Sequence, residues 1–167
     1  MSASKGSRQI MRMLLFIAAW YLLDQATKWW IIEHVMNPPR VIEITSFFNV
    51  VLGRNTGVSF GLLTGLGIPP WALALFSVGV AVVLLIWIGR ATSPLVLTGL
   101  GLVVGGALGN ATDRVHHGAV TDFLDFHVAG WHWPAFNIAD AGVVCGVFLL
   151  VLDALVIRRF NEPLSPQ

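Results

Sequence analysis

The sequence has little charge. Only 11% of its 167 residues are charged, 56% are hydrophobic, and the mean hydropathy is +0.75. A soluble domain carries about 25% charged residues because its surface must face water. The deficit excludes a soluble domain and predicts an integral membrane protein. The net charge is only +1, and the Lys and Arg residues are scattered along the chain without forming a basic patch, so we expect no nucleic-acid partner.

Cysteine is almost absent. The single Cys145 lies inside an apolar run, which excludes a disulfide framework and a cysteine-based zinc site. The first apolar run contains Asp24 and Lys28 and ends in two tryptophans and two isoleucines, without the small-residue cleavage site of a signal peptide. We therefore expect this run to be retained as a membrane helix.

Long apolar runs, by contrast, occur four times. Each is long enough to cross the roughly 30 Å hydrocarbon layer, which takes about 20 residues. The predicted spans are residues 13–32, 71–88, 95–111 and 141–157. With an even number of spans, both ends of the chain lie on the same side of the membrane.

Basic residues beside the spans predict the orientation. Cytoplasmic flanks are enriched in Lys and Arg. Six lie on the side of the two termini: Lys5, Arg8, Arg12, Arg90, Arg158 and Arg159. The other side has Arg40, Arg54 and Arg114. Both termini are therefore predicted to be cytoplasmic, and five tryptophans fall at the outer interface: Trp29, Trp30, Trp71, Trp131 and Trp133.

The two outer connections, residues 33–70 and 112–139, contain short strand patterns. Residues 41–45 and 47–52 resemble strands, and residues 119–128 alternate so that Asp122 shares a face with Val120, Leu124 and Phe126, while Asp125 faces the opposite way. The predicted fold is mainly α. It is a single membrane-embedded domain, a bundle of four transmembrane helices with a small β-rich cap on the outer side. Residues 1–9 and 160–167 are expected to be mobile tails.

Polar residues interrupt the first span on one face. Tyr21, Asp24, Gln25 and Lys28 recur at helical spacing, and Asp24 and Lys28 form an i,i+4 pair. Charges are costly inside a membrane, so this face must point into the bundle. The pair is either a structural link between helices or part of the polar floor of a site.

The third span combines glycines with polar residues. Gly101, Gly105 and Gly109 form overlapping G-x-x-x-G pairs, which permit close helix approach. Asn110, Asp113 and Arg114 follow at the outer end of the helix, where an ordinary interfacial salt bridge is one explanation.

Two acids belong at the same membrane depth. Asn137 and Asp140 fit an N-cap and an N3 acid at the start of the last helix, and Asp122 alone fits a strand residue facing solvent. In combination, Asp122 and Asp140 form a pair in which one carboxyl can be an acid and the other a base. Such a pair activates water against a peptide bond without a metal. Asp153 lies at the far end of its helix and cannot join them.

Five sequence blocks resemble those of the lipoprotein signal peptidase (signal peptidase II) family, the membrane aspartyl proteases of bacterial lipoprotein maturation. They follow the family's order across residues 13–157: "DQATK" at 24–28, "NTGVSF" at 55–60, "GGALGNATDR" at 105–114, "VTDF" at 120–123 and "FNIAD" at 136–140.

The resemblance implies that Asp122 and Asp140 are the catalytic dyad. It also implies that eight residues bind substrate or support the site: Asp24, Lys28, Asn55, Gly106, Asn110, Arg114, Asn137 and Ala139. Val58, Ala111 and Thr121 depart from the family pattern, but none removes a group that the chemistry needs. Strand alternation predicts that Thr121 points away from Asp122.

The family's substrates are prolipoproteins with a diacylglyceryl group on a cysteine, and cleavage falls just before that cysteine. The resemblance implies a bacterial cytoplasmic (inner) membrane protein whose active site lies near the periplasmic face. Its expected partners are lipidated prolipoproteins and membrane lipids, and we expect no metal or other cofactor. We expect a monomer because one bundle can bury all the polar faces.

The position of the dyad's proton is a separate hypothesis. Asp140 belongs at a helix N-terminus, where the dipole stabilises an anion. We therefore expect Asp140 to be ionised and Asp122 to be protonated at rest. Gly53, Gly57, Gly61, Gly65 and Gly67 would allow the outer cap to move as a lid.

Three alternatives remain. A zinc protease could use His116, His117, His127 and His132, but adjacent histidines do not face one site and no H-E-x-x-H helix is present. A proton-coupled carrier could use Asp24, Lys28 and Asp140, although the acids cluster near one interface. A structural lipid-binding scaffold leaves Asp122 and Asp140 without a purpose.

Overall fold

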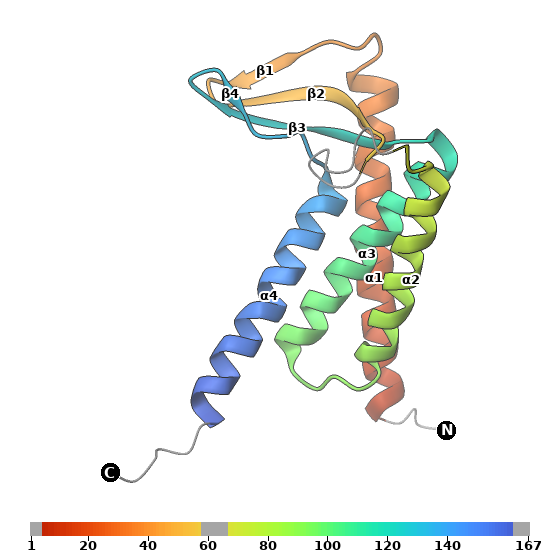
Figure 1. Cartoon of the computed structure of the whole chain (residues 1–167), viewed down its shortest axis with the longest axis vertical. Helices are drawn as coiled ribbons and strands as arrows, with labels where there is room; N and C mark the ends of the chain where they lie inside the picture. The colour runs from red at the N-terminus through yellow and green to blue at the C-terminus, as the bar shows by residue number, and fades with distance from the viewer. Residues whose placement is uncertain (1–4, 58–66, 162–167) are drawn as a thin grey trace.

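The computed structural model describes residues 5–57 and 67–161. Four long helices carry a small sheet at one end (Figure 1). The elements are α1 (Lys5–Trp30), the π-helix η1 (Ile31–Val35), β1 (Ile42–Thr45), β2 (Phe48–Asn55), α2 (Pro70–Ile88), α3 (Pro94–His117), β3 (Val120–Val128), β4 (Trp131–His132) and α4 (Ile138–Asn161). The predicted fold class, a four-helix membrane bundle with a β-rich cap, is confirmed.

All four helices are long and apolar enough to cross a membrane. Helix α1 begins and α4 ends at the end of the bundle opposite the sheet (Figure 1). Large apolar side chains such as Leu75, Phe76 and Val83 on α2 and Phe148 on α4 are exposed, as expected for helices that face lipid.

Helix α3 is the most buried span, and it packs against each of the other three. Glycines make this close approach possible. A Cβ at Gly101 would meet Phe16 of α1, and a Cβ at Gly105 would meet Trp20 of the same helix. Gly99 faces Gly146 on α4 in the same manner. The predicted G-x-x-x-G stripe thus faces α1, and a second glycine face that the sequence reading did not identify faces α4.

The observed helices are longer than the apolar runs predicted. Helix α1 starts at Lys5, so residues 5–9 belong to a helix and not to a mobile tail, and the Gln9 side chain donates to Ala91 O over 3.0 Å. Residues 160–161 likewise end α4. The remaining parts of the two predicted tails lie outside the described residues.

Helix α3 also continues beyond residue 111, to His117. Asn110, Asp113 and Arg114 are therefore inside the helix, because partners on neighbouring elements satisfy the polar side chains of its last turns. Gly118 then ends the helix with a left-handed backbone conformation, φ 70°. Helix α4 likewise begins earlier than predicted, at Ile138 rather than at residue 141, and the Ala139 N–H in its first turn donates to Asp24.

The sheet is antiparallel with the strand order β1-β2-β3-β4. Gly53 of β2 pairs with Asp122 of β3, and a Cβ at Gly53 would lie 3.3 Å from the Asp122 carbonyl oxygen. The Arg54 side chain donates to the Thr121 hydroxyl over 3.1 Å, whereas Asn55 donates to the Asp122 carboxyl. Because Arg54 and Asn55 are adjacent in β2, their side chains lie on opposite faces of the sheet, and so do those of Thr121 and Asp122, as the alternation predicts.

Candidate active site

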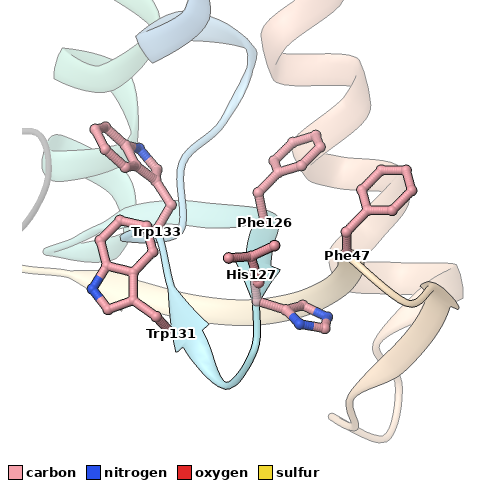
Figure 2. A pocket seen from close by; sticks show the side chains of 6 residues that line it. Phe47, Phe126, His127, Trp131 and Trp133 are labelled. Atoms are coloured by element: carbon pink, nitrogen blue, oxygen red, sulfur yellow. The ribbon is translucent and has the colours of Figure 1, made fainter.

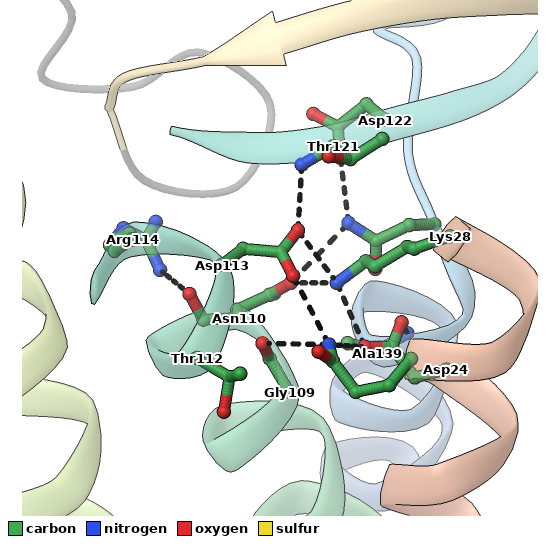
Figure 3. A network of polar contacts seen from close by, with 12 residues as sticks. Asp24, Lys28, Gly109, Asn110, Thr112, Asp113, Arg114, Thr121, Asp122 and Ala139 are labelled. Atoms are coloured by element: carbon green, nitrogen blue, oxygen red, sulfur yellow. Dashed lines mark hydrogen bonds and ion pairs between the residues drawn. The ribbon is translucent and has the colours of Figure 1, made fainter. Parts of the chain in front are cut away.

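Polar side chains from α1, α3, β3 and the start of α4 meet where the bundle joins the sheet (Figure 3). Asp122 is in the first half of β3, 3% exposed, and Asp140 is in the first turn of α4, 4% exposed. The two acids come from different elements of the chain. Asparagine side chains donate hydrogen bonds to both carboxyls and hold them in place.

Asp140 is held at the N-terminus of α4. The Asn137 side-chain oxygen accepts a 2.9 Å hydrogen bond from the Asp140 backbone N–H, so Asn137 is the N-cap and Asp140 occupies N3. The Asn110 side-chain amide of α3 donates to Asp140 Oδ1 over 2.8 Å. The predicted cap is confirmed, and it aims the Asp140 carboxyl at the end of α3.

Asp122 is held by two amides. Asn137 Nδ2 donates to Asp122 Oδ1 over 2.7 Å, and Asn55 Nδ2 donates to Oδ2 over 3.2 Å. Burial raises the pKa of Asp122 and the charge of Asp140 adds to the rise; the two amides and the charge of Lys28 oppose it, leaving a pKa of about 7. A carboxyl with this pKa can hold or release a proton near neutral pH.

Lys28 and Asp24 form a buried ion pair beneath these acids. The Lys28 ammonium lies 2.8 Å from Asp24 Oδ2 and donates to the Asn110 side-chain oxygen over 3.0 Å. Asp24 Oδ1 accepts a 2.9 Å hydrogen bond from the Ala139 backbone N–H. The pair therefore links helices, and Lys28 contacts the same Asn110 side chain whose amide bonds Asp140.

Arg114 links α3 to the segment that follows β2. Its guanidinium donates to Gly57 O over 2.7 Å and to Asn110 O over 3.3 Å, and the Gly57 N–H donates to the Asn55 side-chain oxygen. Arg114 therefore holds the turn that carries Asn55 over the site. Val58 and the lid glycines Gly61 and Gly65 lie outside the described residues.

Gly106 allows α4 to approach the site. A Cβ at this position would collide with the Ala139 carbonyl oxygen of α4. All ten residues expected at the site thus lie in one connected cluster at the sheet end of the bundle.

Residues 16–156 match the family described as signal peptidase (SPase) II. The chain belongs to the signal peptidase II family. This match covers most of the chain and includes each of the ten residues above.

Individual relatives agree. A lipoprotein signal peptidase of Rhodopseudomonas palustris (strain TIE-1) is 47% identical over 140 residues, which cover 80% of this chain and 85% of that protein. One of Beijerinckia indica is 41% identical over 145 residues, covering 85% and 86%. The solved structure of a bacterial membrane enzyme at 2.3 Å resolution aligns with a TM-score of 0.80 and 26% identity, covering 93% of this chain and 94% of that one. The protein is therefore a multi-pass bacterial membrane protein of a peptidase family.

Two residues of the polar cluster were not among the expected site residues. Asp113 pairs with Lys28 at 3.3 Å and accepts from the Thr121 backbone N–H over 2.9 Å, so it joins α1, α3 and β3. Gln25 donates to Asp24 and to Asp113, both over 3.1 Å. The signal for Gln25 was its place on the polar face of α1, and the signal for Asp113 was its place one turn after Asn110.

Two apolar pockets lie at the sheet end of the bundle, one of them lined by Asp140 of the cluster, and the sequence predicted neither. One, of about 260 Å³, is lined by Asp140 together with Trp133, Phe136, Ala141, Val144 and Cys145. The other, of about 360 Å³, lies at the β3–β4 hairpin between aromatic side chains (Figure 2). Trp133 lines both pockets, so apolar surface runs from the sheet to the acid end of α4.

Other acids are engaged elsewhere. Asp125 accepts from Asn49 over 3.0 Å and lies 2.9 Å from His132 Nδ1. Burial alone would raise the pKa of Asp125, but the hydrogen bonds from His132 and Asn49 and the charges of His132 and His127 outweigh it and lower that pKa. Asp153 accepts from the Ser93 hydroxyl over 2.5 Å at the opposite end of α4. Within residues 5–57 and 67–161, no three His, Cys, Asp or Glu side chains are grouped so that they could hold a metal.

Proposed function

We propose that this protein is an aspartyl endopeptidase that removes the signal peptide from diacylglyceryl-modified prolipoproteins. Asp122 and Asp140 are the proposed catalytic residues, and the proposed scissile bond lies just before the lipidated cysteine. The observation that carries the proposal is the asparagine bridge: Asn137 bonds both Asp122 Oδ1 and the Asp140 N–H. The Asn137 side chain thereby links the Asp122 carboxyl to the backbone that carries Asp140, and Asn110 holds the Asp140 carboxyl itself.

The chemistry needs one base and one acid. In this proposal Asp140 is ionised and Asp122 is protonated, an arrangement supported by the N-terminal position of Asp140 and by the pKa of about 7 at Asp122. Asp140 takes a proton from water as the water oxygen bonds to the scissile carbonyl carbon. Asp122 donates its proton to the carbonyl oxygen.

The resulting tetrahedral intermediate then collapses. The C–N bond breaks as the proton held by Asp140 passes to the leaving amine, and the hydroxyl proton returns to Asp122 as the new carboxyl forms. Asn55, Asn110 and Asn137 are positioning residues, because their amides hold the carboxyl oxygens during both steps.

The pocket beside Asp140 supports a lipidated substrate. Its wall combines a catalytic carboxyl with the apolar side chains of Trp133, Phe136 and Val144. The exposed face of α4 continues from Val144 through apolar side chains that would face lipid: Val147, Phe148, Val151 and Leu155. We propose that the substrate enters laterally along this face, with an acyl chain in the pocket and its peptide bond at the dyad.

The orientation follows from the same proposal. The sheet and the dyad would face the periplasm, and both chain ends would be cytoplasmic, in accord with the basic residues beside the spans. The chain would act as a monomer without a cofactor. A carrier would need a polar path through the bundle. Asp24, Lys28 and Asp140 instead belong to one hydrogen-bonded network at the sheet end.

Cleavage of a matched pair of peptides tests this proposal. The full chain in micelles is incubated with a prolipoprotein peptide that carries a diacylglyceryl cysteine and with the same peptide unmodified. We expect mass spectrometry to find a new N-terminal lipidated cysteine from the first peptide and no product from the second. Equal cleavage of both peptides, or cleavage at another bond, would contradict the assigned specificity.

A further inference from the structure

The end of the bundle opposite the sheet has a pocket of its own. It measures about 450 Å³ and lies between the first turns of α1 and the start of α3. Its walls include Arg8, Gln9 and Arg12 from α1, and Thr92 and Leu97 from the beginning of α3 and the segment before it. None of these residues belongs to the proposed active site, so the pocket requires a separate explanation.

The pocket is positively charged. Arg8 and Arg12 are one helical turn apart, so both guanidinium groups project from the same face of α1. Neither arginine forms an ion pair within the part of the chain that the structure describes. Asp153, an acid described at this end, is 9% exposed, accepts a hydrogen bond from the Ser93 hydroxyl and does not line the pocket.

The rest of the lining combines the polar side chains of Gln9 and Thr92 with apolar Met13, Pro94 and Leu97. Met13 and Leu97 form the wall on the side of the membrane core. The Gln9 side chain donates to Ala91 O over 3.0 Å, which fixes α1 against the segment that leads into α3. The pocket therefore presents two cations and a hydroxyl, from Thr92, next to apolar surface at the end of two membrane spans.

We propose that this pocket binds an anionic phospholipid of the adjacent leaflet. The two guanidinium groups and the Thr92 hydroxyl would contact the phosphate, and the Met13–Leu97 wall would contact the upper part of an acyl chain. Guanidinium pairs suit phosphate oxygens, and basic pockets at helix ends attract acidic headgroups. A free anion would use the cations alone, whereas a lipid also uses the apolar wall. This inference does not rest on the proposed peptidase mechanism.

Lipid retention measures this binding directly. The full chain in neutral detergent micelles is titrated with phosphatidylglycerol, phosphatidylcholine of matched chains, or inorganic phosphate. Native mass spectrometry then counts retained lipid, and thermal unfolding gives the Tm. We expect retained phosphatidylglycerol and a rise in Tm, neither of which phosphatidylcholine produces, and no competition by inorganic phosphate at equal concentration.

Charge variants locate the site. Arg8→Gln combined with Arg12→Gln should weaken phosphatidylglycerol retention by about tenfold or more, since each cation near a membrane surface contributes to the attraction. Arg8→Lys with Arg12→Lys keeps the charge and should retain most of the binding, which separates charge loss from damage to α1. Arg90→Gln removes a cation at the same end outside the pocket and should have little effect.

Three results would overturn the proposal. Equal retention by the double Gln variant and the wild type would place the lipid elsewhere. Equal retention of phosphatidylcholine would remove the role of charge, and competition by inorganic phosphate would reduce the pocket to a free-anion site. Peptidase activity is measured in parallel and, being assigned to the opposite end of the bundle, can fail or persist independently of each of these results.

Discussion

The side-chain amide of Asn137 lies 2.7 Å from Oδ1 of Asp122 and donates a hydrogen bond to it. This contact joins the N-cap residue of α4 to the first half of β3, fifteen residues earlier in the chain. The oxygen of the same amide caps α4 at the Asp140 N–H. A single asparagine thus links the Asp122 carboxyl to the backbone of the turn that carries Asp140.

Removal of the bridge should reduce both stability and rate. Asn137→Ala loses the N-cap, worth about 1 kcal/mol, and the bond to Asp122. We expect a lower Tm and a kcat reduced by about tenfold or more, because a carboxyl misplaced by a fraction of an ångström reacts poorly. Asn49→Ala is the matched control, since Asn49 bonds Asp125 outside the site. A normal kcat in folded Asn137→Ala would contradict the positioning role.

The pH dependence of cleavage should reflect Asp122. Because its pKa is raised to about 7, the protonated acid is lost as the pH rises through that value, and the rate should fall on the alkaline side. The Asn55 amide lowers this pKa, so Asn55→Ala should raise it further and move the alkaline limb to higher pH. Pre-steady-state rates between about pH 5 and pH 9 test the shift. A limb that stays in place or moves to lower pH would count against the assignment.

Variants of Lys28 distinguish the structural role of the ion pair from its proposed role in the site. Lys28→Met leaves two buried acids, Asp24 and Asp113, without their cation, and removing the partner of a buried charge costs about 3–5 kcal/mol. Lys28→Met combined with Asp24→Leu removes one of these two acids together with the cation, and it should recover part of that stability while Asp113 remains unpaired. Because Lys28 also orients Asn110, the double variant should remain slow in cleavage. Unfolding in denaturant and kcat, measured on the same preparations, give the two results separately.

Recovery of full activity in that double variant would leave the ion pair as a purely structural link. If neither variant folds, Asp24→Asn is used in place of Asp24→Leu, because its side-chain oxygen still accepts the hydrogen bond from the Ala139 N–H.

Cys145 offers a chemical test of the pocket beside Asp140. The thiol is exposed and lines that pocket, so a maleimide added there should occupy the space proposed for an acyl chain. We expect modified protein to show a higher KM for the lipidated peptide with little change in kcat. Cys145→Ser, which the reagent cannot modify, should keep its KM under the same treatment. An unchanged KM after complete modification would mean that the acyl chain lies elsewhere.

Local patterns in the sequence predicted much of the fold. The Asp24–Lys28 pair and the Asn137 cap were predictable because each depends on residues three or four positions apart in one helix. Alternation along residues 119–128 placed Thr121 and Asp122 on opposite faces for the same reason. The apolar runs located all four spans, since a membrane demands a minimum length of apolar helix.

Contacts between distant segments were not predictable from these patterns. Hydropathy ended α3 at residue 111, whereas the helix continues because Lys28 of α1 pairs with Asp113. The bond from the Ala139 N–H to Asp24 spans 115 positions and leaves no local trace. The pocket beside Asp140 is likewise formed by the segment from Trp133 to Phe136 folding against the first turns of α4. Such features follow from how the helices and the sheet pack.

Single-turnover cleavage of the diacylglyceryl peptide by four folded variants tests the proposed dyad most directly. Asp122→Asn and Asp140→Asn remove the proposed acid and base, and Asp125→Asn and Asp153→Asn remove acids bonded elsewhere. A dyad of Asp122 and Asp140 predicts a loss of about a thousandfold for each of the first two variants and near-normal rates for the others. Near-normal cleavage by folded Asp140→Asn would contradict it, leaving Asp140 as a residue of the helix N-terminus and not as half of a dyad.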